Sequence, residues 1–301
     1  MSPQGRNALV TDYDVYHDES QVAGFWHGIL LVPRESRQRL LSLLAAIRQN
    51  TGRTDPISLK QLDKSSGPLF RCISCWIQVG VAALLQRFKG EAYSVPTGLA
   101  GQRTEFVPFT QILGARFVLF RVTCPMNTLK LCPDHTARVE TTFRMAFKGG
   151  LSLFSRAGHE LRIRSLHFDG HKQYGRRLEL YRILRGIENE FEIPNDIVLD
   201  DATSDHREPD GQSYDDCQLL QLTDLLVSGF RTVLSEGKQN AQLQVAEPLR
   251  KLATRFYRGQ KGFSNSRWHL GFCLSEGTIE DGHWKFGPIP TGDDSAQPRL
   301  F

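Results

Sequence analysis

Three aspartates stand where their carboxylates could meet and hold a metal ion. Asp18 lies near the end of a strand-like segment over 14–20, Asp169 ends another over 161–170, and Asp224 lies in a helix-like segment over 214–235. Hard divalent cations such as Mg²⁺ prefer oxygen ligands, commonly one or two carboxylates together with water and substrate phosphate. Two such ions about 3.5–4 Å apart stabilise the attacking and leaving oxygens of a phosphodiester. The three aspartates are therefore candidate ligands for Mg²⁺ or Mn²⁺.

Among the three aspartates, Asp224 is the hardest to explain without a bound cation. It interrupts a leucine-rich run, and Gln221 and Ser228 share its stripe on the predicted helix at spacings of three and four residues. A lone carboxylate is costly to bury without a partner. Either this stripe faces water or Asp224 reaches a cation.

Other acidic residues leave alternatives open. Asp18, Glu19 and Ser20 could form a simple polar turn, because Asp and Ser favour turns. Asp200 and Asp201 end a third strand-like segment over 193–199, and their part in any site stays open.

Strand alternation predicts which way the side chains near Asp18 point. Val15, His17 and Glu19 should face one side of the sheet, and Tyr16 and Asp18 the other. By the same alternation we expect His17 and His167 to point away from the aspartates that follow them, as core or solvated histidines. His171 and His206 lie on predicted loops and are open.

The elements that must position these residues alternate as in an α/β protein. Apolar periodicity predicts strands over 14–20, 25–32, 115–122, 161–170 and 193–199, and helices over 33–50, 69–88, 133–154, 177–191 and 214–235. The segment 57–62 alternates apolar and polar residues like a brief strand or an extended arm, with Lys60 projecting from it. A terminal strand pair is expected over 268–274 and 282–286.

The domain organisation expected from this pattern is a single domain over 1–287. It carries an insertion at about 90–111, where Gly, Pro and Thr replace patterned apolar residues, and a flexible tail over 288–301.

Composition favours a soluble, cytoplasmic protein that does not contact a membrane. Of 301 residues, 40% are hydrophobic and 23% charged, and the longest apolar runs fall far short of the roughly 20 residues that span a bilayer. The N-terminus lacks the basic and apolar blocks of a signal peptide. The six cysteines are scattered, and the pair Cys72 and Cys75 reads as core, with half of a zinc site as the alternative.

Charge is unevenly distributed along the chain. Residues 138–185 hold eleven basic and four acidic side chains, whereas residues 186–216 hold eleven acidic side chains and a single arginine. Arg176 and Arg177 in the basic block are candidate nucleic-acid contacts, because Lys and Arg neutralise backbone phosphates. The alternative is a pair of solvated helix faces.

The motifs together resemble the bacterial family named domain of unknown function 3800. The segments that carry the resemblance are Tyr16–Ser20 (YHDES), Ile57–Leu62 (ISLKQL), His167–Asp169 (HFD) and Leu220–Leu226 (LQLTDLL), within roughly residues 13–234. The sequence departs from the family pattern at Gln21, where Gly is frequent, and at Thr223, where Ala is usual.

The resemblance implies a ribonuclease-H-like fold, a mixed sheet with helices on both faces, here with helical insertions and the C-terminal strand pair. It implies Asp18, Asp169 and Asp224 as metal ligands and catalytic residues, with Glu19 as a further candidate. It also implies that Lys60 contacts phosphate and that Gln221 contacts substrate or supports a ligand.

The function expected on these grounds is a metal-dependent nuclease that hydrolyses phosphodiester bonds of DNA or RNA by a two-metal mechanism. The resemblance further implies a role in mobile elements or antiviral defence, with a protein partner. The alternatives are a non-catalytic subunit that binds nucleic acid or protein, and hydrolysis of small nucleotide phosphoesters.

Overall fold

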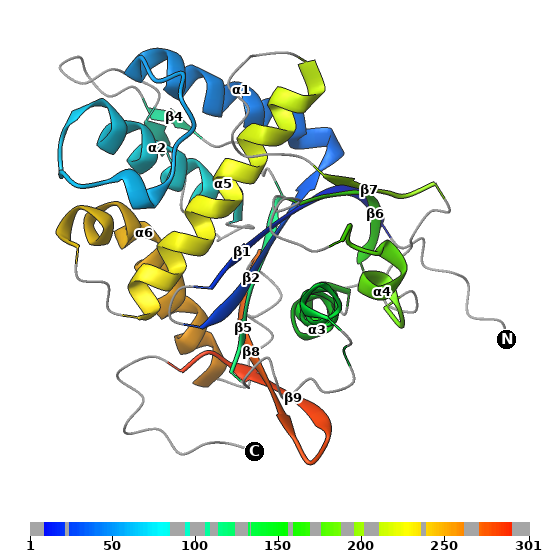
Figure 1. The fold of residues 1–301 in the computed structure, drawn as a ribbon. Helices are drawn as coiled ribbons and strands as arrows, with labels where there is room; N and C mark the ends of the chain where they lie inside the picture. Colours follow the sequence, from blue (N-terminus) through cyan, green and yellow to red (C-terminus); the bar gives the residue numbers. More distant parts are fainter. Residues whose placement is uncertain are drawn as a thin grey trace, which may run out of the picture.

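Seven strands form one mixed sheet in the computed structural model of the chain, in the order β7-β6-β1-β2-β5-β8-β9 (Figure 1). β1 pairs antiparallel with β2 and β2 antiparallel with β5, while β6 lies parallel to β1 and β7 parallel to β6. β8 is parallel to β5, and β9 returns antiparallel to β8. The strands are β1 (Leu9–Ser20), β2 (Phe25–Pro33), β5 (Arg116–Val122), β6 (His159–Phe168), β7 (Val198–Asp201), β8 (Phe272–Glu280) and β9 (His283–Pro288).

The structure describes most of the chain, with gaps at both ends and in several connections. The described residues are 9–21, 24–84, 94–96, 106–108, 114–123, 132, 134–155, 159–168, 176–187, 196–201, 211–235, 239–261 and 271–290. Within the predicted insertion at about 90–111, the described part is a small separate sheet of β3 (Ser94–Pro96) and β4 (Phe106–Pro108).

Helices cover both faces of the large sheet, as the sequence predicted. Figure 1 shows α3 and α4 on one face and α1, α2, α5 and α6 on the other. The fold is therefore α/β with a mixed sheet between two helical layers. The helices are α1 (Arg34–Thr51), the 3₁₀ turn η1 (Leu59–Gln61), α2 (Gly67–Leu84), α3 (His135–Ser155), α4 (Leu180–Leu184), α5 (Gly211–Leu234) and α6 (Asn240–Lys261).

Strand alternation divides the apolar core in two. Tyr16 on β1 belongs to the cluster under α1, α2, α5 and α6. Tyr13 and Val15 belong to the cluster under α3 and α4. Successive side chains of a strand point to opposite faces, so the prediction that Tyr16 and Val15 face opposite sides is confirmed.

A glycine lets α5 approach the sheet beside Asp18. Gly28 on β2 is the register partner of Asp18 on β1. A methyl group at Gly28 would overlap the side chain of Val227 on α5. The absence of a side chain at Gly28 therefore lets the residues around Val227 on the helix lie close above the end of β1.

Helix α2 meets the length and composition of a membrane span, contrary to the expectation that no segment does. Its apolar residues are largely internal: ten of the 18 are buried, among them Trp76 and Ile77. The Trp76 indole donates a hydrogen bond of 3.2 Å to the Leu44 carbonyl on α1. The apolar character of α2 thus serves the core between α1, α5 and α6.

Several predicted elements differ from the structure. The segment 57–62 is not a strand. Ser58 and Gln61 form a capping box around η1, in which the side chain of each residue accepts a hydrogen bond from the backbone N–H of the other. Within 177–191 the described helix is only α4, which ends at a turn before Gly186, a residue with φ of 76°. Helix α6 was not predicted, and Ile289, assigned to the tail, is buried in the core.

Candidate functional site

Helix α5 lies across the strands that carry the predicted carboxylates, and it contributes Asp216 and Asp224. These two residues are two turns apart, about 12 Å along the axis at 1.5 Å per residue. On β1, alternation directs Asp14, Tyr16 and Asp18 toward this helix. The carboxylates on this face therefore form two separate groups, one around Asp224 and one around Asp216.

Asp224 is partly buried among polar and charged side chains. The Ser228 hydroxyl donates to Asp224 Oδ1 at 3.1 Å. Burial raises the pKa of Asp224 above its ordinary value, against the lowering effects of a Ser58 hydrogen bond, the Ser228 bond, and the charges of Lys60 and Arg231. The raised pKa means that the surroundings do not fully compensate the charged carboxylate, which is the condition in which a divalent cation would stabilise it.

Arg231 connects the end of β1 to Asp224. Its Nη1 atom donates a hydrogen bond to the Ser20 hydroxyl. Burial lowers the pKa of Arg231, and the negative charges of Asp224 and Asp18 oppose that shift. The charges of both carboxylates thus act on one guanidinium, and Asp18 also lies beneath α5 through its register partner Gly28, which packs against Val227.

Gln221 fixes the position of the segment that carries Ser58 and Lys60. Its side chain is buried, and its Oε1 atom accepts hydrogen bonds from the Ile57 N–H at 3.1 Å and from Arg48 Nη2 on α1. Lys60 itself is exposed. The predicted roles of these two residues remain predictions; the geometry makes Gln221 a positioning residue for the Lys60 segment.

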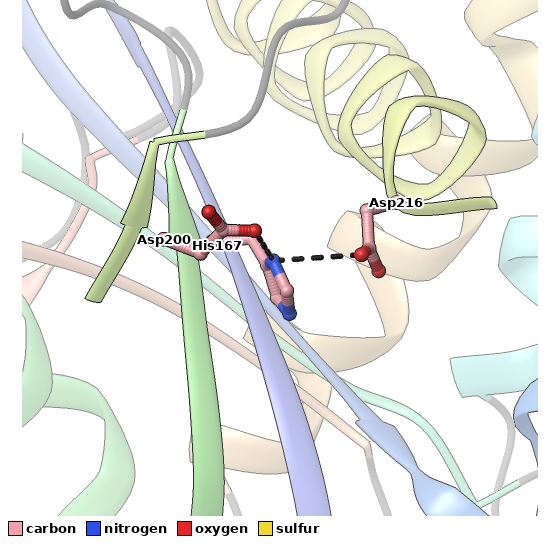
Figure 2. A group of neighbouring side chains, drawn as sticks. All are labelled: His167, Asp200 and Asp216. Atoms are coloured by element: carbon pink, nitrogen blue, oxygen red, sulfur yellow. Dashed lines mark hydrogen bonds and ion pairs between the residues drawn. The ribbon is translucent and has the colours of Figure 1, made fainter. Parts of the chain in front are cut away.

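A second group brings His167 on β6 together with Asp200 on β7 and Asp216 on α5 (Figure 2). His167 Nδ1 lies 3.1 Å from Asp200 Oδ2 and 3.7 Å from Asp216 Oδ2. One potential ligand atom from each residue lies within 4.8 Å of the others. His167 and Asp216 are buried, whereas the Asp200 side chain is 54% exposed.

Tyr16 and Arg37 fix the orientation of Asp216. The Tyr16 hydroxyl and Arg37 Nη2 each donate to Asp216 Oδ1 at 2.8 Å. Burial and the Asp216 charge raise the pKa of Tyr16 well above its ordinary value, so the hydroxyl keeps its proton and acts as a donor. The Tyr16 ring also stacks on His167, with ring centroids 4.9 Å apart.

The remaining candidates from the sequence are Asp169, His171, His206 and Glu19. Asp169 and His171 lie outside the described residues, as does His206. Alternation places Glu19 on the face of β1 that carries Val15, so Asp18 and Glu19 point to opposite sides of the sheet.

Arg176 lies on the α3 side of the sheet, opposite to α5. Its guanidinium contacts both carboxylate oxygens of Glu140 on α3, at 2.7 and 3.0 Å, and Asp134 at 3.4 Å. Glu140 is fully buried. Arg177 is exposed. The geometry gives Arg176 a structural partner, and its predicted contact with nucleic acid remains a prediction.

His17 is a core histidine on the face of β1 opposite to Asp18, as strand alternation predicted. His17 Nε2 lies 2.8 Å from His27 Nδ1, and His27 Nε2 lies 2.8 Å from the Thr142 hydroxyl on α3. Burial lowers the pKa of His27 to about 3 and the pKa of His17 well below its ordinary value. Both rings are therefore neutral at pH 7.

The cysteine pair on α2 also belongs to the core. Burial raises the pKa of Cys72 and raises that of Cys75 to about 11, so both side chains are thiols at pH 7. Among the described residues, neither cysteine joins a group of potential metal ligands.

Sequence reasoning missed Asp216, and it expected His167 to be a solvated or core histidine; His167 is buried, and the structure adds Asp200 and Asp216 as its neighbours. A signal existed for both. Asp216 precedes Asp224 by eight residues, a spacing that keeps both on one broad side of a helix. His167 precedes Asp169 by two residues, which is the spacing of side chains on one face of a strand.

Comparison with protein-family models, with curated proteins and with solved structures finds no match. The resemblance to the domain of unknown function 3800 family therefore stays a prediction.

Proposed function

We propose that this protein is a divalent-metal-dependent phosphodiester hydrolase acting on DNA or RNA, with Asp18 and Asp224 as metal ligands. The observation that carries the proposal is the position of Asp18 on β1 beneath α5: its register partner Gly28 lies against Val227, three residues after Asp224, and the exposed Lys60 belongs to the segment held by Gln221. Carboxylates held on separate rigid elements, with a nearby ammonium, suit a phosphodiester substrate and its cation.

The strand arrangement supports the more specific proposal of a ribonuclease-H-like fold. The strands β5, β2, β1, β6 and β7 are consecutive neighbours, and β2 alone runs against the other four. They form a five-stranded mixed sheet with helices on both faces. Asp18 lies near the end of its central strand, which is the position expected for a metal ligand in this fold class.

The residues of the site have distinct tasks in this proposal. Asp18 and Asp224 hold Mg²⁺ or Mn²⁺ and, when bound, the ion supplies a Lewis acid and lowers the pKa of a coordinated water. Ser228 and Ser58 hold the Asp224 carboxylate in place. Lys60 contacts a backbone phosphate as a point charge.

A second candidate function rests on Arg231. Its guanidinium interacts with the same two carboxylates that would bind the metal. A permanent ion pair there would make the protein a non-catalytic subunit that binds nucleic acid or a protein partner, in a mobile-element or defence system.

An assay of hydrolysis with labelled substrates distinguishes the metal-dependent hydrolase from the non-catalytic subunit. Single- and double-stranded DNA, RNA and an RNA–DNA hybrid would be incubated with the wild type in Mn²⁺ or Mg²⁺. Asp18→Asn and Asp224→Asn are expected to lower cleavage by at least about 100-fold, equivalent to about 2.7 kcal/mol of lost transition-state stabilisation. Asp281→Asn, in the exposed turn between β8 and β9, is the matched control and should cleave like the wild type.

Cleavage that persists in both site variants would refute the ligand assignment. Wild-type protein that binds these nucleic acids but cleaves none of them in either metal would favour the non-catalytic subunit. Turnover restricted to mononucleotide esters would instead indicate a small-nucleotide phosphoesterase.

A further inference from the structure

A group of potential metal ligands lies apart from Asp18 and Asp224. We propose that His167 Nδ1, Asp200 Oδ2 and Asp216 Oδ2 bind one divalent transition-metal ion, separate from the Asp18–Asp224 locus (Figure 2). This inference does not depend on the proposed hydrolase function. It rests on the hydrogen bonds that orient His167 and Asp216 and on the short distance from His167 to Asp200.

The tautomer of His167 follows from its neighbours. The Ser165 hydroxyl donates its single proton to Asp14 Oδ1 at 2.7 Å. Ser165 Oγ also lies 2.9 Å from His167 Nε2, so it must accept from that nitrogen, which therefore carries a proton. A neutral His167 consequently presents its Nδ1 lone pair to Asp200 and Asp216.

This arrangement requires a cation. A lone pair facing two carboxylates, which are acceptors only, is repulsive, and His167 is only 4% exposed to solvent that could relieve it. Either a second proton makes His167 an imidazolium or a metal ion lies between the three ligand atoms. A histidine that binds a metal through one ring nitrogen is usually held in place by a hydrogen bond that its other ring nitrogen donates to a neighbouring acceptor.

Asp216 is oriented in the same manner. Its Oδ1 atom accepts from Tyr16 and Arg37, which leaves Oδ2 directed toward His167. Arg37 also compensates the charge of Asp216, as Arg34 does for Asp14 through a bond of 2.9 Å. The ligand atoms of His167 and Asp216 are therefore the free ends of groups whose other ends are fixed, and the more exposed Asp200 approaches them from β7.

The spacing of the ligand atoms suits one ion. Zinc binds His nitrogen and carboxylate oxygen at about 2.0–2.2 Å, so neighbouring ligand atoms lie about 3.0–3.6 Å apart. The two distances from His167 Nδ1, 3.1 and 3.7 Å, are close to that range. Asp216 and Asp224 lie roughly 12 Å apart along α5, and among the described residues the group that could hold a metal contains Asp216 without Asp224.

The donor set indicates the class of metal. One imidazole with two carboxylates suits Zn²⁺, Co²⁺, Fe²⁺ or Mn²⁺, whereas Mg²⁺ prefers oxygen ligands only. Three protein ligands leave a coordination position for water or an anionic ligand. The exposed side of Asp200 gives that position access to solvent.

Titration with Co²⁺ tests the site, because its visible absorption reports bound ligands. In excess Mg²⁺, which competes for the oxygen ligands Asp18 and Asp224, the wild type should still bind one equivalent of Co²⁺, with a spectrum that Zn²⁺ removes. Asp200→Asn, at an exposed side chain that leaves the core intact, and His167→Gln should each weaken this binding by at least about tenfold. Asp196→Asn, an exposed neighbour in the turn before β7, is the matched control and should leave it unchanged.

Asp224→Asn keeps this test separate from the proposed function. The Co²⁺ signal should survive in that variant even if nucleic-acid cleavage is lost. Ser165→Ala should weaken Co²⁺ binding about tenfold without removing a ligand, because His167 loses its orienting partner. Equal affinity in Asp200→Asn and the wild type, or a wild type that binds no Co²⁺ and shows His167 doubly protonated in nitrogen NMR spectra at pH 7, would overturn the inference.

Discussion

The guanidinium of Arg176 donates to both carboxylate oxygens of Glu140, at 2.7 and 3.0 Å, although Glu140 has no exposed surface. The pair joins the loop before α4 to α3, on the side of the sheet away from Asp224. An arginine in the basic block thus stabilises a buried charge in the fold, and the adjacent Arg177 remains exposed.

Replacing Arg176 should therefore lower stability. Arg176→Gln leaves the Glu140 carboxylate buried with weaker compensation. Breaking a buried pair costs about 3–5 kcal/mol, and we expect about 1–3 kcal/mol here, because the Glu179 N–H and Arg182 still contact Glu140. Urea unfolding measures the change, with Arg177→Gln as the matched control. Equal destabilisation by both variants would contradict a specific role of the Arg176–Glu140 pair.

Lys60 is the sharper test of nucleic-acid contact. If its ammonium neutralises one phosphate, Lys60→Gln should reduce the log–log salt slope of binding by about 0.7–0.9. Lys251→Gln, at an exposed position on α6, should leave the slope unchanged. Fluorescence anisotropy at several salt concentrations gives both slopes, and identical slopes for Lys60→Gln and the wild type would remove Lys60 from the interface.

The buried histidine pair predicts loss of stability in mild acid. His27 is neutral in the folded state, with its pKa at about 3, whereas the unfolded chain takes up a proton near pH 6.5. The unfolded state therefore gains stability as pH falls below 6.5, by about 1.4 kcal/mol from His27 at pH 5.5. The depressed pKa of His17 adds a loss in the same direction.

Urea unfolding between pH 7.5 and 5.5 measures this dependence. His27→Gln cannot take up the proton in either state, so its stability should vary less with pH than that of the wild type. Parallel curves for the two proteins would show that His27 does not titrate differently on unfolding.

Asp224 should oppose folding when no metal is bound. Because its pKa is raised in the folded state, the folded protein binds a proton more readily than the unfolded chain, and the stabilising effect of that proton is lost as pH rises through the raised pKa. In the presence of a chelator at pH 7.5, Asp224→Asn should be at least as stable as the wild type. A clear destabilisation would mean that the charge of Asp224 stabilises the fold, through its effect on Arg231 and its bond with Ser228, and that Asp224 is structural.

Much of the architecture was predictable from the sequence because it depends on local periodicity. The alternation in β1 predicted that Tyr16 and Val15 separate to the two faces, and the leucine spacing of 214–235 predicted α5. The segment 57–62 was misread because alternation over six residues is too short to distinguish a strand from a 3₁₀ turn, and the Ser58–Gln61 spacing of a capping box was the decisive signal.

The candidate sites were less predictable because they depend on how elements cross. Periodicity shows that Asp216 and Asp224 share a side of α5, but only the tertiary packing shows which strands lie beneath each. Asp216 lies over β6 and β7, where it meets His167 and Asp200, and Asp224 lies over the end of β1. The partners Arg37 and Arg231 carry no recognisable motif, so the sequence alone could not identify them.

A crystal of the wild-type protein soaked in Mn²⁺ tests the central claim most directly, through the anomalous scattering of manganese. The account predicts a peak between the carboxylates of Asp18 and Asp224, with Arg231 displaced from at least one of them, and no such peak in crystals of Asp224→Asn. A wild-type map with no peak there, in which the Arg231 guanidinium bridges both carboxylates, would contradict the proposed hydrolase site whatever is bound at His167.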